Sequence, residues 1–351
     1  MKLTTTAAVL FKTGKPLRLV ELTVPDLQRG QVLVKVAYSG VCRSQLMEVR
    51  GGRGPDRWLP HLLGHEGSGV VVGVGPGVRK VKKGDRVVLT WIRGTGLNAP
   101  GPQYRLGKLA INAGAVTTFS TYTIVAENRC VRIPRRFPLD VAALFGCAIP
   151  TGAGIVMNQV RPPPGSTAGV FGVGGVGLGA LAALRLYRCA GVLAVDQDRS
   201  KLALARRFGA TRVADTRRGR VERAVRDMTG GRGLDFAIEA GGSVESIEAA
   251  FRSVRDGGGL CVFASHPPAG EKICLEPHDL IRGKRIEGSW GGGSHPDRDV
   301  PRWVQLYRSG RVPLEEMIAR RFSLAEVNRA LDVLEKGVPG RVLIDMSRKA
   351  R

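Results

Sequence analysis

Two cysteines and a histidine have the side chains in this sequence that could most specifically act together: Cys42, His65 and Cys147. A thiolate, an imidazole and a second thiolate supply the three protein ligands of a catalytic zinc ion, leaving a fourth position for water or substrate. Glu66 directly follows His65 and could approach the same ion. Residues this far apart are usually unrelated, so spacing alone leaves open that each is simply a buried core side chain.

A glycine-rich segment is the second chemical feature, and it reads Gly172-Val173-Gly174-Gly175-Val176-Gly177. A strand-like segment (167–171) precedes it and an apolar helical segment (176–187) follows it. The first glycine permits a tight turn, the second lets the backbone approach a pyrophosphate, and the third lets helix and strand pack closely. The helix N-terminus adds N–H groups for the anion. The pattern therefore predicts a dinucleotide-binding turn, with a plain packing turn as the alternative.

Asp196 closes the next predicted strand, 19 residues after Gly177. A carboxylate there can accept hydrogen bonds from both ribose hydroxyls of NAD and would repel the 2′-phosphate of NADP. We also assign Lys201 to the cofactor site. Arg199 keeps NADP open as a second option, but the pattern favours NAD.

The elements that must position these residues fall into two groups. Between residues 35 and 125, short β-rich segments alternate with glycine-containing turns, which indicates a small, partly antiparallel β-domain. Residues 94–114 are crowded with Gly, Pro and Asn and have no period, so we expect a long irregular lobe. After 162–165, strands and helices alternate, which indicates βαβ units around a parallel sheet. We predict an α/β protein with one domain at 1–152 and 295–351 and another at 153–294.

Length, composition and charge narrow the class of protein. A chain of 351 residues with 43% hydrophobic residues can bury two cores. No apolar run is long enough to suggest a membrane span, the N-terminus does not resemble a secretory signal, and six scattered cysteines do not suggest a disulfide scaffold. We therefore expect a cytoplasmic protein. Its 54 Lys and Arg against 30 Asp and Glu give a net charge of +24, which is compatible with nucleic acid, membranes or anionic small molecules as partners.

The segments around the possible metal ligands resemble a known family. Gly64-His65-Glu66-Gly67 looks like the signature of the zinc-dependent alcohol dehydrogenases, in the medium-chain dehydrogenase/reductase superfamily. The segments 40–44 and 144–147 resemble the family's first and third ligand segments, and 337–342 resembles its closing strand. The resemblance covers essentially the whole chain. It implies a GroES-like β-rich catalytic domain, a Rossmann cofactor domain, and hydride transfer between NAD(H) and an alcohol/carbonyl pair.

The resemblance also implies roles for single residues. Cys42, His65 and Cys147 would bind zinc, Glu66 would lie behind the metal or exchange with its water, and Ser44 would pass the hydroxyl proton outward. Arg43 and Arg341 would hold the cofactor pyrophosphate. The residues expected at the nicotinamide are Thr151, Val176, Ala264, Ser265 and His266.

The chain departs from the family pattern in two places. Many members carry a structural zinc on four cysteines after the GHE segment, but residues 91–116 contain no cysteine, so we expect one zinc per subunit and no structural zinc. Met47 stands where some members place a relay histidine, and Gln45 where an acidic residue is common.

The substrate is the least specified part of the prediction. Met47, Trp91 and Ile92 are expected in the substrate pocket, with Arg93, Gln45 or His295 as polar contacts. A pocket lined by both apolar and polar side chains favours a secondary alcohol of a sugar, cyclitol or polyol derivative over a hydrophobic or allylic alcohol or aldehyde. A nucleic-acid-binding protein on the same fold is a rival that we disfavour, because the cations are spread along the chain without interleaved aromatic residues. We expect neither nucleic acid nor membrane as a partner, and a homodimer or homotetramer.

Overall fold

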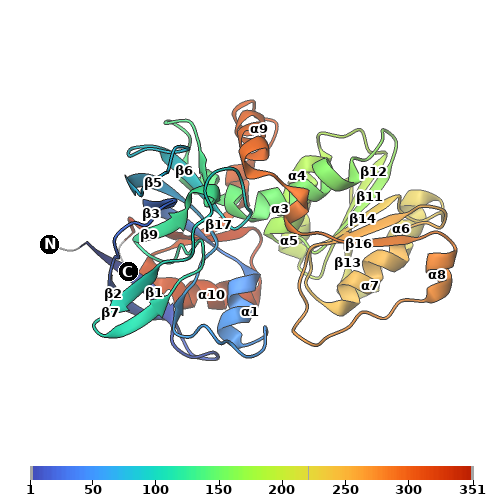
Figure 1. Cartoon of the computed structure of the whole chain (residues 1–351). Helices are drawn as coiled ribbons and strands as arrows, with labels where there is room; N and C mark the ends of the chain where they lie inside the picture. Colours follow the sequence, from blue (N-terminus) through green and yellow to red (C-terminus); the bar gives the residue numbers. More distant parts are fainter. Residues whose placement is uncertain (1–2, 220, 349–351) are drawn as a thin grey trace. The chain divides into compact units, whose positions relative to one another are not determined.

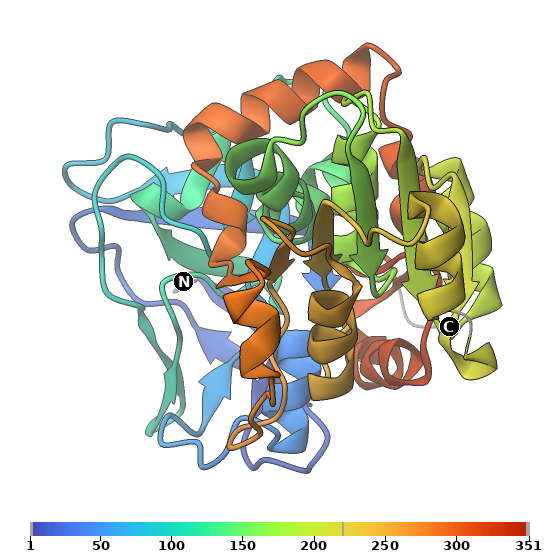
Figure 2. The same ribbon diagram turned by 90° about the vertical axis from the view of Figure 1, so that its right-hand side faces the viewer.

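The structure is a computed structural model that describes residues 3–219 and 221–348 and divides the chain into two compact units. Unit 1 comprises Met1–Cys147, His295–Gly337 and Arg341–Arg351. Unit 2 comprises Ala148–Ser294 and Val338–Gly340. In Figures 1 and 2, blue, teal and red mark most of unit 1, and green to orange mark unit 2.

Unit 1 is built mainly from β-strands. Its helices and strands are β1 (Thr4–Leu10), β2 (Arg18–Thr23), β3 (Gln31–Val41), α1 (Arg43–Arg50), β4 (His61–Leu62), β5 (Glu66–Val74), β6 (Arg86–Thr90), β7 (Gln103–Leu106), β8 (Leu109–Asn112), β9 (Tyr122–Ala126), β10 (Cys130–Arg132), α2 (Leu139–Ala143), α9 (Pro296–Arg308), β17 (Ile318–Phe322), α10 (Val327–Lys336) and β18 (Arg341–Asp345). One sheet closes as a barrel in the order β1-β2-β7-β8-β4. The other has the order β10-β6-β5-β3-β18-β17, with β9 also paired to β3.

Strand β3 shows why this segment forms a sheet. Val32, Val34 and Val36 alternate along it and are all buried, because every second side chain of a strand points to the same face. They pack in one core cluster with Val71, Val87 and Leu89 from β5 and β6. β3 therefore forms the centre of the sheet and holds its neighbours in register.

Residues 94–114 contain more regular structure than the sequence suggested. β7 and β8 lie inside this segment and pair as a hairpin, with Tyr104 opposite Ile111, and both side chains are fully buried. Gly107 adopts a φ of 58° at the two-residue turn, a conformation that favours glycine. The expectation of an irregular lobe was wrong for 103–112, because four-residue strands are too short to show a clear alternation.

Unit 2 contains a parallel sheet. Its elements are α3 (Ala148–Gly154), a π-helical turn (Ile155–Val160), β11 (Thr167–Phe171), α4 (Gly175–Leu184), β12 (Gly191–Asp196), α5 (Arg199–Arg207), β13 (Arg212–Asp215), α6 (Val221–Thr229), β14 (Phe236–Glu239), α7 (Val244–Ser253), β15 (Leu260–Phe263), α8 (Pro277–Ile281) and β16 (Arg285–Gly288). The strand order is β13-β12-β11-β14-β15-β16, and every neighbouring pair is parallel. This is the Rossmann order, whose reversal between β11 and β14 is where such sheets bind ligands.

Among the described residues, no single helix is long and apolar enough to cross a membrane. One bent pair of short helices, Leu139–Gly146 with Ala148–Val160, is long and apolar enough to cross a membrane if judged by length and composition alone.

Candidate active site

The strand order of unit 1 brings the three possible zinc ligands together. β3 and β5 pair antiparallel, so the end of β3 lies beside the start of β5. Cys42 follows β3 as the N-cap of α1, and His65 immediately precedes β5. Cys147 follows the short turn Leu144–Gly146, which packs on β5. One ligand atom from each of the three residues lies within 4.8 Å of the other two.

The His65 ring has one nitrogen with a partner and one without. The side-chain amide of Gln45 contacts Nδ1, while the Oε1 atom of Gln45 accepts a hydrogen bond of 2.9 Å from the Cys42 backbone N–H. His65 Nε2 is buried and makes no hydrogen bond with any residue that the structure describes. A buried nitrogen without a partner is costly unless it binds something else. With two thiols beside it, this donor set fits a zinc ion.

The two thiols of the cluster differ in acidity. A hydrogen bond from Cys147 and the positive charge of Arg341 lower the pKa of the Cys42 thiol, although burial acts in the opposite direction. The same contact, together with burial, raises the pKa of the Cys147 thiol. Cys42 is thus favoured as a thiolate, which is the form that binds metal.

Glu66 lies behind the three ligands and forms a buried ion pair with Arg341. The exposed fractions of these residues are 0% for Glu66 and 4% for Arg341. A Cβ atom at Gly40 would overlap the Glu66 carboxylate, and one at Gly146 would overlap the Glu66 backbone, so both positions require glycine. The carboxylate is not a member of the three-ligand cluster. Metal exchange by Glu66 and pyrophosphate binding by Arg341 stay predictions. In the structure, the two side chains form an ion pair with each other.

The remaining predicted residues of unit 1 lie near this cluster. Arg43 and Ser44 begin α1; Arg43 is exposed and Ser44 is half-buried. Trp91 meets the His65 ring edge-on, with 6.5 Å between the ring centroids, and packs against the core cluster around β3. It is thus both a core residue and a neighbour of a possible ligand. Ile92 is buried, and Met47 is half-buried on α1.

A cavity of about 360 Å³ in unit 1 reaches one of the three possible zinc ligands, His65. Gln45 and His65 line it together with residues that the sequence analysis did not single out, among them Glu48, His61 and Thr117. Met47, Trp91 and Ile92, the predicted pocket residues, are not among those lining it. The spacing of Gln45 and Glu48, three residues apart on one helix, is the one sequence signal that could have placed Glu48 here.

The three glycines of the turn in unit 2 each have a different surrounding. Gly172 has a φ of 87° and lies against the backbone of Gly241, where a Cβ atom would overlap it. A Cβ atom at Gly174, the N-cap of α4, would meet nothing within 4 Å. A Cβ atom at Gly177 would overlap the carbonyl oxygen of Gly172. The turn thus packs closely at its first and third glycines and leaves open space at its second, where an anion could approach.

Asp196, at the end of β12, is hydrogen-bonded to this turn. Its Oδ2 atom accepts a hydrogen bond of 2.8 Å from the Val173 N–H, and its Oδ1 atom accepts one of 3.0 Å from the Asp198 N–H. Lys201 Nζ lies 4.0 Å from Oδ1. The carboxylate is therefore fixed beside the glycine turn, with lone pairs left to accept further hydrogen bonds.

Two further groups lie beside the turn in unit 2. The hydroxyl of Thr151 is buried without a partner among the described residues, and the neighbouring Gly152 packs directly on the backbone of Val176. Glu239, at the end of β14, is fully buried and accepts hydrogen bonds from the N–H groups of Gly241 and Gly242 at 2.7 and 3.0 Å. Ser265 donates its hydroxyl hydrogen to the same carboxylate.

The sequence analysis missed Glu239, although an acid at the end of a predicted strand, followed by two glycines, was a signal. Of the predicted nicotinamide contacts after β15, Ser265 is held by Glu239, and the Ala264 N–H donates to the Glu239 carbonyl oxygen at 3.1 Å. His266 is exposed.

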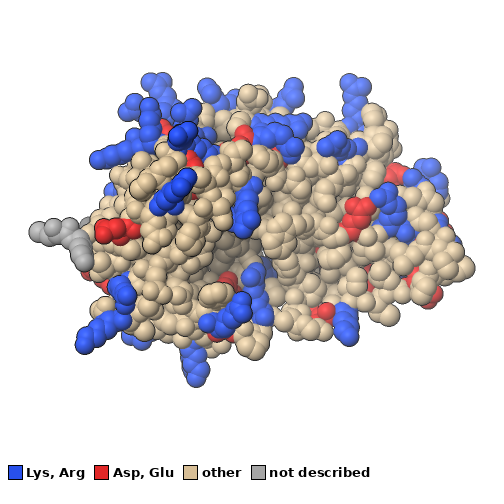
Figure 3. Space-filling view, in the orientation of Figure 1, with Lys and Arg blue, Asp and Glu red and all other residues tan. Residues whose placement is uncertain are grey.

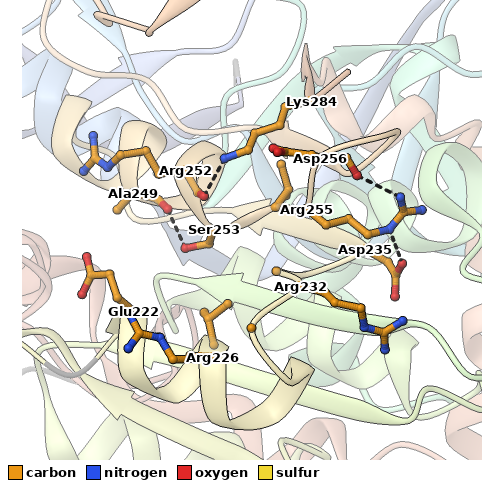
Figure 4. A pocket seen from close by; sticks show the side chains of 14 residues that line it. Glu222, Arg226, Arg232, Asp235, Ala249, Arg252, Ser253, Arg255, Asp256 and Lys284 are labelled. Carbon is orange, nitrogen blue, oxygen red and sulfur yellow. Dashed lines mark hydrogen bonds and ion pairs between the residues drawn. The ribbon is translucent and has the colours of Figure 1, made fainter. Parts of the chain in front are cut away.

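A second cavity, of about 920 Å³, lies on unit 2 and is lined mainly by charged residues (Figure 4). Arg255 there forms a 2.7 Å bond with Asp235. Asp235 precedes β14, so this cavity is at the amino ends of the strands. Cofactors bind at the carboxyl ends, so we do not assign it to the cofactor.

Comparison with known proteins identifies relatives of both units. The alcohol dehydrogenase GroES-like domain matches residues 28–135, and the zinc-binding dehydrogenase domain matches residues 175–308. The chain is 32% identical to an S-(hydroxymethyl)glutathione dehydrogenase of Escherichia coli O1:K1, an alignment covering 96% of this chain and 98% of that protein.

Two crystal structures are similar over nearly the whole chain. An alcohol dehydrogenase zinc-binding domain protein from Burkholderia ambifaria has a TM-score of 0.90 at 28% identity, covering 98% of this chain and 99% of that one. The benzyl alcohol dehydrogenase of Acinetobacter calcoaceticus has a TM-score of 0.88 at 29% identity, covering 97% and 99%. The chain therefore belongs to the zinc-dependent alcohol dehydrogenases of the medium-chain dehydrogenase/reductase superfamily.

Proposed function

We propose that this protein is an NAD-dependent zinc alcohol dehydrogenase that interconverts a secondary alcohol of a sugar, cyclitol or polyol derivative and its carbonyl compound. The observation that carries the reaction class is the cluster of Cys42, His65 and Cys147 with the unpartnered Nε2 atom of His65. A zinc ion held there would supply a Lewis acid for the alcohol oxygen, and a bound nicotinamide would supply the hydride acceptor.

The residues of the chain prepare and orient these groups. The Gln45 amide holds the His65 ring, and the buried Glu66–Arg341 pair lies behind the ligands and keeps them in place. Ser44, at the start of α1, is proposed to receive the hydroxyl proton of the substrate. Arg43 is proposed to bind the cofactor pyrophosphate.

Three features of unit 2 support NAD as the cofactor. The open space beside Gly174 can admit a pyrophosphate, the Asp196 carboxylate can accept hydrogen bonds from ribose hydroxyls, and the Thr151 hydroxyl has no partner in the described chain. A 2′-phosphate would meet the negative charge of Asp196, so NADP is less favoured. We further propose a homodimer or homotetramer. All six cysteines are free thiols, which supports a reducing compartment such as the cytoplasm.

The relatives name two other substrate classes. S-(hydroxymethyl)glutathione and benzyl alcohol are the substrates in the names of a curated relative and a structural neighbour. A hydrophobic or allylic alcohol is therefore the second candidate for this chain, and the polar side chains in the cavity beside His65 favour the first.

The test is a panel of alcohols with NAD and NADP, followed by the absorbance of the reduced nicotinamide. We expect NAD reduction with polyols or cyclitols by the zinc-loaded protein, and loss of at least about 100-fold in kcat after the Cys147→Ser substitution, because the Lewis acid would lose a ligand. The absence of reduction of either nucleotide by any alcohol of the panel would overturn the proposal.

A further inference from the structure

The cavity beside His65 contains polar groups that its own walls do not satisfy. We propose that it is a substrate subsite in which Glu48 and Thr117 recognise the hydroxyl groups of an uncharged polyol. The inference rests on the proposed dehydrogenase function, and it assigns the substrate class to named side chains.

The helix α1 places the subsite next to His65, one of the three possible zinc ligands. Gln45 and Glu48 are three residues apart in this helix and both line the cavity, because residues at this spacing share one helical face. Gln45 contacts the ring of His65, which also lines the cavity. A substrate whose reacting carbon is near His65 would therefore extend its other groups past Glu48.

His61 and Asp56 satisfy each other and leave Glu48 without a hydrogen bond from the His61 ring. His61 Nε2 lies 2.8 Å from Asp56 Oδ2, and His61 Nδ1 lies 2.9 Å from the carbonyl oxygen of Leu62. Both ring nitrogens thus have an acceptor within hydrogen-bond distance. Glu48 Oε1 is 4.0 Å from Nε2, beyond hydrogen-bond distance. The Glu48 side chain is 29% exposed, so its carboxylate is partly removed from water.

Thr117 supplies an independent observation that points to a ligand. It is 4% exposed and lines the cavity, and its side-chain hydroxyl is buried without a hydrogen-bond partner among the described residues. A buried hydroxyl without a partner is destabilising. A substrate hydroxyl could remove that cost, because it can donate to one oxygen and accept from another.

The charges of the lining favour an uncharged substrate. Glu48 is the acceptor left after His61 and Asp56 have paired, and Arg53 at the exposed edge of the same cavity supplies one positive charge. Glu48 and Arg53 carry opposite charges, so these two groups give the lining no net charge that would select an anionic or a cationic substrate. Hydroxyl groups satisfy both without placing a charge in the cavity. An apolar alcohol would leave Glu48 and Thr117 unpaired, and sites built to bind hydroxyl groups discriminate strongly against such analogues.

The test compares alcohols that differ only in their additional hydroxyl groups. The pairs are myo-inositol with cyclohexanol, sorbitol with 2-hexanol, and xylitol with 2-pentanol, assayed with zinc-loaded wild type, Glu48→Gln and Thr117→Val. For the best polyol, we expect kcat/KM to fall about 10–100-fold in each variant, as for a lost hydrogen bond to a charged or buried group. For its deoxygenated partner we expect a change of less than about threefold. Glu21→Gln, in an exposed part of β2, is the matched control and should alter neither.

A binding measurement separates this inference from the proposed function. The thermal shift produced by the same polyol in the zinc-loaded protein should be reduced in Glu48→Gln and Thr117→Val, independently of turnover. The inference fails if wild type prefers the deoxygenated alcohols and Glu48→Gln changes neither member of a pair, while the dehydrogenase function then stands. Conversely, no turnover of any alcohol together with a polyol shift that needs Glu48 would overturn the function and support the subsite.

Metal analysis provides a further decisive outcome. Glu48, Asp56 and His61 also lie close enough together to hold a cation. Wild type should contain about one zinc per subunit and Glu48→Gln the same amount. Two metal ions per wild-type subunit, with one lost in Glu48→Gln, would replace the substrate subsite with a second metal site.

Discussion

Asp196 uses both carboxylate oxygens to hold backbone N–H groups beside the glycine turn. If it also accepts hydrogen bonds from the cofactor ribose, Asp196→Asn should weaken NAD binding and remove the repulsion of a 2′-phosphate. The ratio of kcat/KM for NAD to that for NADP should fall about 10–100-fold, the effect of losing one or two charge-assisted hydrogen bonds. Steady-state kinetics with both nucleotides measures this ratio.

Asp198→Asn is the control for this prediction. Asp198 caps α5 by accepting a hydrogen bond of 2.8 Å from the Ser200 N–H, and Asn can make the same bond, so this substitution should leave cofactor choice unchanged. If Asp196→Asn left the ratio of kcat/KM for NAD to that for NADP unchanged, the carboxylate would serve only to hold the glycine turn and not to select the cofactor.

The buried pair of Glu66 and Arg341 gives a second prediction about single residues. Glu66→Gln leaves the Arg341 guanidinium buried without its counter-charge, and breaking a buried pair in this way costs about 3–5 kcal/mol. Urea unfolding of the zinc-loaded protein, followed by circular dichroism, should show this loss in the free energy of unfolding. Replacing both members, with Glu66→Gln and Arg341→Met, should recover part of it.

An exposed ion pair supplies the comparison. Glu335 is bonded to Arg50 at 2.7 Å, with side chains 47% and 39% exposed, so Glu335→Gln should cost no more than about 1 kcal/mol. Equal losses in Glu66→Gln and Glu335→Gln would mean that burial adds nothing to the Glu66 pair.

The residues that could be predicted from the sequence are those whose surroundings are local. Cys42, His65 and the glycine turn stand in short segments with a recognisable pattern, and the structure places the three possible ligands together. Glu48 and Thr117 could not be found in this way, because they are 69 positions apart and meet one cavity only after β-strands from distant segments pair.

At the scale of elements, the cysteine-free lobe is anchored by carboxylates. The Glu127 carboxylate accepts hydrogen bonds from three backbone N–H groups: those of Arg79 and Lys80 at 2.6 and 2.7 Å, and that of Leu97 in the lobe at 2.6 Å. Asp297, in the first turn of α9, accepts another from the Thr95 N–H at 2.6 Å. These bonds connect the lobe to two other segments of unit 1.

The Glu127 anchor predicts a pH dependence. Burial alone would raise the pKa of Glu127, but the backbone hydrogen bonds outweigh it and hold this pKa below the ordinary value of 4.5. A lowered folded-state pKa means that ionised Glu127 stabilises the fold above the unfolded-state pKa, and that this contribution is lost as pH falls through the folded-state pKa. Glu127→Gln should therefore lower the free energy of unfolding near neutral pH by about 1–3 kcal/mol and have a smaller effect in acid.

Urea unfolding at a series of pH values tests this, with limited proteolysis of residues 92–116 as a local readout. Glu21→Gln, an exposed glutamate without such bonds in the described chain, is the control. A Glu127→Gln effect of equal size at neutral and acid pH would contradict an electrostatic anchor.

The elements themselves were predicted unevenly, for physical reasons. The predicted strand at 167–171 agrees with β11, and the predicted helix at 176–187 corresponds to α4, because buried parallel strands and their helices are continuous apolar segments. Helix α9 begins at Pro296, since proline is favoured in the first turn and Asp297 and Asp299 follow it. The hairpin of β7 and β8 was missed because each of its strands has only four residues, too few to show a clear alternation.

At the scale of the whole molecule, the excess of positive charge is distributed rather than concentrated in one site. Figure 3 shows Lys and Arg side chains scattered over the face in view, with fewer Asp and Glu side chains. Even in the charged cavity of unit 2, Arg255 forms an ion pair with Asp235 (Figure 4). Asp256, which also lines the cavity, lies 3.1 Å from Arg282 outside it. With 54 cations and 30 acids in the chain, many cations still have no acidic counterpart. Scattered charge of this kind produces a general attraction to polyanions without a defined binding register.

This distribution predicts weak, salt-sensitive binding to nucleic acid. Each phosphate contact releases a counterion, so a shift assay should show sequence-independent binding at low salt that disappears by about 200 mM salt for both duplex and single-stranded DNA. Stacking of bases on aromatic side chains would add a contribution to the affinity that depends less on salt. Only 5% of the residues are aromatic, and large exposed aromatic side chains in the described chain are few, Trp58 and Trp290 among them, so we expect this contribution to be small. Tight binding that persists at about 200 mM salt, and that inhibits NAD reduction competitively with the alcohol, would instead place a polyanion site at the catalytic cavity and contradict an uncharged substrate there.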